Sequence, residues 1–253
     1  MLKAPLFFKY FSARMPRSAP LTKTSSFLSI NDTPDAIPSP LVDLKNQAQS
    51  KKLCDENGFR RPDAHWSFVI SVCASYDQAP NTRTVNFQRI SPEGIEFVSR
   101  NKTDSIFDHN RPVSFLYTEG KYKPGQKVVQ WRGDGSCEKI DLDEVLEYVP
   151  EYSVTEIIAS CRARKEIDNT SDRMSIQGLQ SKFTAIVQET RTDLATSNVS
   201  PEELKSCIQA WRFIPDNMEM MTGGTDEIMW ERWEFSREEG SLNWREPRQL
   251  MPY

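Results

Sequence analysis

The order of strand-like and helix-like segments constrains the fold of this chain more than any other feature. After a short helical segment at 41–54, β-branched and alternating apolar residues predict strands at 66–74, 82–90, 95–99, 112–118 and 127–140, with a second short helix at 101–110. Helical spacing then covers 141–163, 174–187 and the segment after Ser200, and strands return at 209–214, 217–221, 228–237 and 244–250. Because a doubly wound sheet would alternate strands with helices, this order predicts a mainly β, α+β fold: an antiparallel barrel with helices packed on it.

Local motifs mark several ends of these elements. Ser91-Pro92-Glu93-Gly94 predicts a hairpin turn, and Ser200-Pro201 predicts a helix start, with a capping serine before a proline. Gly133-Asp134-Gly135 interrupts the strand at 127–140. This glycine motif is too short to cradle a dinucleotide, so it predicts a bulge or a bend in the strand.

The first 31 residues differ in charge from the rest of the chain. They hold five basic side chains and no Asp or Glu, so the remaining residues carry 27 basic against 36 acidic side chains. Two interpretations remain open: a mitochondrial transit segment, or a disordered basic tail. We therefore expect residues 1–38 to stand apart from one folded domain, 39–253, in a mitochondrial or cytoplasmic protein that is not secreted.

Composition argues against several classes of function. The formal charge of −4 gives no reason to expect a nucleic acid partner, and no stretch reaches the roughly 20 apolar residues of a membrane span. Five cysteines without a CxxC pair, beside two histidines, argue against structural zinc and a disulfide framework. The motifs of serine hydrolases, P-loop proteins, zinc proteases and dinucleotide-binding folds are absent.

Three strand residues have side chains suited to binding. Arg83 begins its strand, where a guanidinium can hold a phosphate by two hydrogen bonds, although a solvated strand-end cation is the commoner case at such a position. Gln130 lies in an apolar strand, so its amide needs a partner, either a flavin ring or a backbone edge. Arg232 lies among aromatic residues that could stack on a ring, but its acidic neighbours Glu231 and Glu234 also fit an ion-paired surface position.

Taken together and in order, these segments resemble the pyridoxamine 5′-phosphate oxidase family, whose fold is an FMN-binding split β-barrel. The similar segments run from about residue 62 to the end: Arg83-Thr84-Val85 with Gly94 and Phe97, then 110–116, 130–140, 218–224, Arg232, Trp244 and 248–252. Their shared order, rather than any single motif, carries the resemblance.

The resemblance implies a homodimer that binds FMN with residues of both chains. The cofactor-binding residues that it implies are Arg83, at the FMN phosphate, with Thr84, Val85, Gln88, Val98, Ser99, Gln130 and Arg232; the substrate residue is Tyr148. It implies an oxidase that passes a hydride from a phosphorylated small molecule, pyridoxamine or pyridoxine 5′-phosphate, to FMN and yields pyridoxal 5′-phosphate. The flavin carries this chemistry and the protein positions it.

The chain departs from the family at several cationic positions. Gln88 replaces a lysine, Thr103 and Asp104 replace an arginine and a lysine, and Glu227 lies near a substrate-binding motif. Each lost charged hydrogen bond would weaken phosphate binding by about 1.5–3 kcal/mol. Two functions therefore remain: an FMN-dependent oxidoreductase with the family's or another substrate, or a catalytically inactive paralogue that keeps the barrel as a binding or scaffold module.

Overall fold

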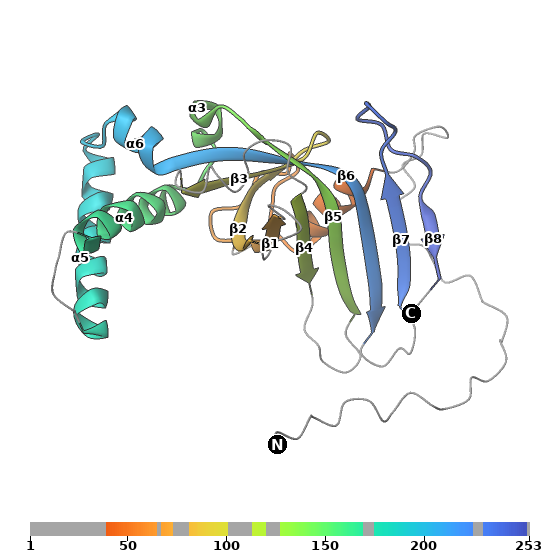
Figure 1. Cartoon of the computed structure of the whole chain (residues 1–253), viewed down its shortest axis with the longest axis horizontal. Helices are drawn as coiled ribbons and strands as arrows, with labels where there is room; N and C mark the ends of the chain where they lie inside the picture. Colours follow the sequence, from red (N-terminus) through yellow and green to blue (C-terminus); the bar gives the residue numbers. More distant parts are fainter. Residues whose placement is uncertain are drawn as a thin grey trace, which may run out of the picture.

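The computed structural model describes residues 39–64, 67–72, 81–100, 113–119, 127–168, 175–224 and 230–251 (Figure 1). The expected basic segment at 1–38, the short helix at 101–110 and most of the turn at 77–81 lie outside these residues. Within the described ranges, the chain forms five helices and one eight-stranded sheet. The expected α+β class is confirmed.

The strands pair antiparallel throughout, in the order β3-β2-β1-β4-β5-β6-β7-β8. Their bounds are β1 Ser67–Val72, β2 Asn81–Ile90, β3 Ile95–Arg100, β4 Val113–Glu119, β5 Lys127–Lys139, β6 Ile208–Gly224, β7 Glu231–Ser236 and β8 Arg248–Leu250. β3 also pairs with the first half of β6, so β1 to β6 form a circuit in which each strand has two neighbours. β7 and β8 extend the sheet from the other half of β6.

β6 is one strand of 17 residues, where the sequence suggested two strands separated near Pro215. Its register with β5 shifts between Asp134 and Gly135, opposite Pro215 and Asn217, so the irregularity expected at the glycines is confirmed. The extra residue, Asp216, lies on β6, and the shift accommodates a proline that cannot donate to the ladder. A side chain at Gly135 would collide with β6, because its Cβ would lie 2.1 Å from a backbone oxygen.

The strand expected at 244–250 is mostly wrong, because only β8 forms. Trp244 instead makes one isolated bridge with Arg237. Pro247 lacks the N–H that a longer ladder would need.

The helices are α1 Pro40–Ser50, α3 Leu142–Leu146, α4 Glu151–Asp168, α5 Ile176–Ala195 and α6 Pro201–Cys207. The helical region expected at 141–163 is divided into α3 and α4. Pro150 accounts for the break, because a proline disfavours helical geometry at the residue before it. Ser200 caps α6 as expected: its hydroxyl accepts from the backbone N–H of Glu203 at 3.1 Å. Among the described residues, no helix is long and apolar enough to cross a bilayer.

Aromatic side chains fill the interior of the sheet. The largest buried ones are Phe87, Phe97, Phe115, Trp131, Trp211, Phe213 and Phe235. A second apolar cluster joins Val98, Ile208 and Ala210 of the sheet to Val154 and Ile158 of α4 and to α3. This cluster holds α4 against β3 and β6.

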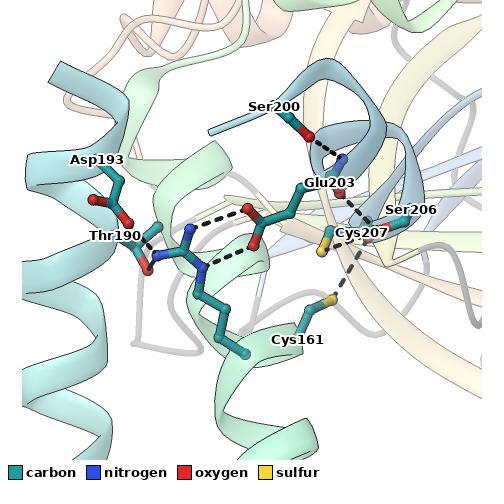
Figure 2. A network of polar contacts seen from close by, with 8 residues as sticks. Cys161, Thr190, Asp193, Ser200, Glu203, Ser206 and Cys207 are labelled. Carbon is teal, nitrogen blue, oxygen red and sulfur yellow. Dashed lines mark hydrogen bonds and ion pairs between the residues drawn. The ribbon is translucent and has the colours of Figure 1, made fainter. Parts of the chain in front are cut away.

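One arginine side chain links the helices α4, α5 and α6 (Figure 2). Nε of Arg162, on α4, donates to Glu203 of α6 at 2.8 Å, and Nη1 donates to Asp193 of α5 at 2.6 Å. Figure 1 shows these helices at the end of the sheet away from β7 and β8. α4 therefore has one side against the strands and another against α5 and α6.

Candidate functional site

A pocket of about 310 Å³ opens where β2 and β3 meet α4. Its walls come from the three elements, and the residues are Thr84, Val85, Asn86 and Gln88 of β2, Val98, Ser99 and Arg100 of β3, and Ser153, Glu156 and Ile157 of α4. Five of the nine residues that the sequence singled out thus line one pocket. They are brought together by the hairpin at 91–94, which lays β3 beside β2.

Gln88 owes its position in the pocket to a bulge in β2. Phe87 pairs with Phe97 and Arg89 pairs with Glu96, so Gln88 is the extra residue between two ladder positions. Its backbone oxygen accepts instead from the backbone N–H of Arg60 at 2.8 Å. The bulge frees the Gln88 side chain to face α4 rather than the neighbouring strand.

Two buried polar atoms at this pocket have no partner among the described residues. The Gln88 side chain is fully buried, and its Nε2 donates to the backbone oxygen of Asn86 at 3.3 Å, but its Oε1 accepts nothing. The buried hydroxyl of Ser153, across the pocket, is equally unpartnered. An unsatisfied buried polar group costs about 1–3 kcal/mol, so both atoms are suited to a polar ligand.

Ser99 contributes a hydroxyl that is already half used. It accepts from Nε1 of Trp211 at 3.1 Å, which leaves its own O–H to donate. Val85 and Val98 supply buried apolar wall beside it. Such a mixture of apolar surface with a few fixed polar groups is typical of a small-molecule site.

The charges at the pocket do not favour an anion strongly. Among the described lining side chains, Arg100 and Glu156 are the charged ones, one of each sign. Arg83, expected at the FMN phosphate, has its backbone in β2, paired with Ile70, but its side chain lies outside the described part of the structure. Thr103 and Asp104 also lie outside it.

Gln130 and Arg232 are not part of the pocket lining. Both lie opposite Met221 of β6, Gln130 on β5 and Arg232 on β7, so they form a row across three strands. Gln130 Nε2 donates to Thr118 Oγ1 at 3.2 Å. The structure therefore separates these two predicted flavin residues from the five that line the pocket.

Arg232 already has an acidic partner. Its Nε donates to Glu219 Oε1 at 2.6 Å, and Arg132 donates to the other oxygen of the same carboxylate. Burial opposes ionisation of Glu219, but the two arginine hydrogen bonds outweigh it and hold the pKa of the carboxyl below its usual value. Glu219 and its two partners are therefore a stable ion-paired group on the sheet.

Tyr148, the expected substrate residue, is also engaged elsewhere. Its hydroxyl donates to the buried carboxylate of Glu96, which also accepts from Arg212, and its ring packs against Phe59 with centroids 4.8 Å apart. Burial, and then the bond to Glu96, raise the pKa of the Tyr148 phenol. In this chain the phenol links the segment that follows α3 to Glu96 of β3.

Sequence reasoning missed the helical wall of the pocket. Ser153, Glu156 and Ile157 follow an i, i+3, i+4 spacing, so they share one face of α4. That spacing could have marked a common face but not what the face meets. Among the described residues there is also no cluster of His, Cys, Asp and Glu that could hold a metal ion.

Comparisons with known proteins support the fold. No protein-family model matches the sequence, and no curated protein sequence matches it significantly. The solved structure of PhzG from Burkholderia lata 383, in complex with tetrahydrophenazine-1-carboxylic acid, matches with a TM-score of 0.50 and 15% identity over 87% of this chain and 95% of PhzG. A pyridoxamine 5′-phosphate oxidase-related, FMN-binding protein from Nostoc punctiforme PCC 73102 matches with a TM-score of 0.45 and 12% identity, over 74% of this chain and 88% of that one.

These identities are low enough that the likeness concerns the fold alone. The resemblance that the sequence motifs carry is confirmed at that level: this chain has, in divergent form, the split β-barrel fold of the pyridoxamine 5′-phosphate oxidase-related proteins.

Proposed function

We propose that the chain binds FMN in the pocket between β2, β3 and α4 and acts as an oxidoreductase related to pyridoxamine 5′-phosphate oxidase. The observation that carries this is the pocket itself, in which the buried side-chain carbonyl of Gln88 and the Ser153 hydroxyl have no partner in the described part of the chain. A flavin ring carries both N–H and carbonyl groups along one edge, which would satisfy an amide oxygen and a hydroxyl.

The residues of the pocket would position and shield the flavin. Gln88 Oε1 would accept a ring N–H, and the hydroxyls of Ser99 and Ser153 would donate to ring acceptors. Val85, Val98 and Ile157 would exclude water from the ring. Bound FMN supplies the acceptor for a hydride from the substrate, and its later reoxidation by oxygen yields peroxide.

We further propose that the functional unit is a homodimer. Gln130 and Arg232 lie on β5 and β7, outside the pocket lining, while the resemblance assigns both to the flavin. A second copy whose β5–β7 surface covers the pocket would bring the two groups of residues to one cofactor. Sedimentation of the full chain as a monomer in the presence of FMN would rule out this arrangement.

The alternative is a non-catalytic paralogue that keeps the barrel as a binding module. It is favoured by the partners of two predicted residues, since Arg232 forms an ion pair with Glu219 and the Tyr148 hydroxyl donates a hydrogen bond to Glu96. Neither side chain is then available to a phosphorylated substrate without breaking one of these partly buried hydrogen bonds.

Purified full-length protein distinguishes the two functions. An oxidoreductase should carry a flavin absorption band and release peroxide from pyridoxamine 5′-phosphate, and Arg83→Ala should abolish the release, whereas Arg61→Ala, an exposed position near the same sheet, should not. A flavin-loaded protein that is silent on this substrate would keep the cofactor and remove the vitamin B6 assignment. Protein that neither retains nor rebinds FMN would support the binding module.

A further inference from the structure

Four side chains near the bulge of β2 carry buried polar atoms that have no hydrogen-bond partner among the described residues. They come from three segments of the chain: Arg60 from the loop after α1, Gln88 from β2, and Tyr152 and Ser153 from α4. Among the described residues, both Nη atoms of Arg60, Oε1 of Gln88, and the hydroxyls of Tyr152 and Ser153 make no hydrogen bond. One such atom could be an accident of packing, but a cluster of them indicates an absent partner.

The guanidinium of Arg60 is held in a fixed orientation. Its Nε donates to the backbone oxygen of Ala64 at 2.8 Å, and its Cζ lies 5.2 Å from the centroid of the Tyr152 ring. Arg60 is only 4% exposed. With the Nε and the flat face occupied, the two Nη groups form a rigid fork with no described group to bind.

Arg60 adjoins the pocket on two sides. Its backbone N–H donates to Gln88, and its guanidinium lies over the residue next to Ser153. Glu156, one turn further along α4, lines the pocket and interacts electrostatically with the guanidinium. Arg60 is therefore a neighbour of the lining residues Gln88 and Ser153, although neither Arg60 nor Tyr152 is itself among the described residues that line the pocket.

A buried guanidinium without an anion is costly. Desolvation by burial lowers the pKa of Arg60, and the attraction of Glu156 only partly opposes this. An oxyanion bound by both Nη groups would offset the cost of desolvation, because two oxygens of a carboxylate or of a phosphate can each accept a hydrogen bond from the charged guanidinium. The hydroxyls of Tyr152 and Ser153 could donate to the same oxyanion.

We propose that Arg60, with the hydroxyls of Tyr152 and Ser153, binds an oxyanion, a phosphate or a carboxylate, of the ligand that fills this pocket. The oxyanion belongs either to the flavin, as its phosphate, or to a second ligand, and only the first source rests on the proposed function. The main competing explanation is that Glu156 turns inward and pairs with Arg60.

Binding measurements on the full-length chain test this site. FMN and riboflavin differ by one phosphate, and phenyl phosphate and benzoate offer the two oxyanions on the same ring. Each is titrated at constant ionic strength into wild type, Arg60→Gln and the control Arg61→Gln. We expect Arg60→Gln to weaken at least one oxyanion ligand by about 10- to 100-fold, the loss of a charged hydrogen bond, and to leave riboflavin unchanged. Arg61→Gln should match wild type.

The pattern of losses identifies the source. Weakened FMN with unchanged riboflavin assigns the oxyanion to the flavin phosphate; unchanged FMN with weakened phenyl phosphate or benzoate assigns it to a second ligand. If wild type binds neither flavin but binds phenyl phosphate through Arg60, the proposed function fails and the oxyanion site stands. Equal affinities in wild type and Arg60→Gln for all four probes, or no binding of any probe, overturn the site.

If Arg60→Gln does not fold, Glu156→Gln tests the oxyanion site in its place. Removal of this carboxylate should tighten binding of the oxyanion probes, because it competes for the guanidinium. If Glu156 is instead the true partner of Arg60, Glu156→Gln should lower the unfolding temperature and leave the affinities for all probes unchanged, and this result would overturn the site.

Discussion

Two arginines at α4 have different surroundings: Arg162 belongs to the helix, and Arg60 contacts it through the ring of Tyr152. Arg162 donates to Glu203, Asp193 and Thr190, and the bonds to the two carboxylates, Glu203 first, raise its pKa (Figure 2). Arg60 is more deeply buried, has no acidic hydrogen-bond partner among the described residues, and has a lowered pKa because of burial. The same side chain thus serves two purposes, and the difference lies in whether the fold itself supplies the anion.

The comparison distinguishes two kinds of polar side chain in this molecule: those that stabilise the fold and those suited to binding a ligand. At the junction of α4, α5 and α6, the charged side chain of Arg162 forms ion pairs with carboxylates of the same chain. The same holds for Arg232 and Glu219 on the sheet. At the pocket, by contrast, the lining residues Gln88 and Ser153 and the neighbouring Arg60 have polar atoms without a partner in the ranges that the structure describes. A chain selected only for stability would close these groups or replace them with apolar side chains.

The largest effect is expected where the fold supplies the partners. Arg162→Met leaves two carboxylates without their cation, so we expect the free energy of unfolding in urea to fall by about 2–3 kcal/mol. Arg191→Met, an exposed position on the neighbouring helix α5, is the matched control and should change it by less than about 0.5 kcal/mol. Equal losses in the two variants would show that the three-helix junction is not stabilised by Arg162.

Arg60→Met should show the opposite behaviour. In buffer without phosphate or carboxylate ligands, the variant removes an uncompensated buried charge, so its unfolding free energy should lie within about 1 kcal/mol of wild type. Urea unfolding under the same conditions as for Arg162→Met makes the comparison direct. A loss as large as that of Arg162→Met would place Arg60 among the structural arginines.

Ser99 belongs to both kinds of polar side chain, because it lines the pocket and its hydroxyl accepts a hydrogen bond from Trp211. Ser99→Ala removes the hydroxyl that accepts from the buried indole N–H of Trp211, and we expect a loss of about 1 kcal/mol in unfolding free energy together with weaker FMN binding. Ser114→Ala, an exposed position on β4, should alter neither. If Ser99→Ala changes stability alone, Ser99 does not touch the ligand.

The smallest effect concerns pH. Hydrogen bonding from Arg162 is the largest cause that holds the pKa of Glu203 below its usual 4.5. A depressed folded-state pKa gives stability that is present above the unfolded value and is lost as the pH falls below about 4.5 through the folded one. We expect this loss to be under about 1 kcal/mol because the pair is partly exposed, and to vanish in Arg162→Met. An unchanged acid limb of the stability curve in that variant would contradict it.

The sequence predicts most elements of this fold because side-chain periodicity is local information. Alternation in β2 and β4 and the Ser200-Pro201 helix start reach the structure nearly unchanged. Where prediction fails, the cause is tertiary: β6 continues through Pro215 because a register shift with β5 absorbs the proline, and Trp244 stays out of β8.

The candidate site was only partly visible for the same reason. Thr84, Val85, Val98 and Ser99 follow from strand pairing, and the motif resemblance pointed to them. Arg60 lies in a loop whose sequence has no helical or strand periodicity. Its burial depends on how that loop packs between β2 and α4. No sequence pattern distinguishes it from Arg61, its exposed neighbour.

The central claim, that the pocket between β2, β3 and α4 is a flavin site, is tested most directly by filling that pocket. Glu156→Trp and Lys165→Trp introduce the same ring at two exposed positions of α4, of which only the first lines the pocket. The quenching of FMN fluorescence should give a saturable titration for wild type and Lys165→Trp and at least a tenfold weaker one, about 1.4 kcal/mol, for Glu156→Trp. Equal FMN affinity in the two variants would contradict the account.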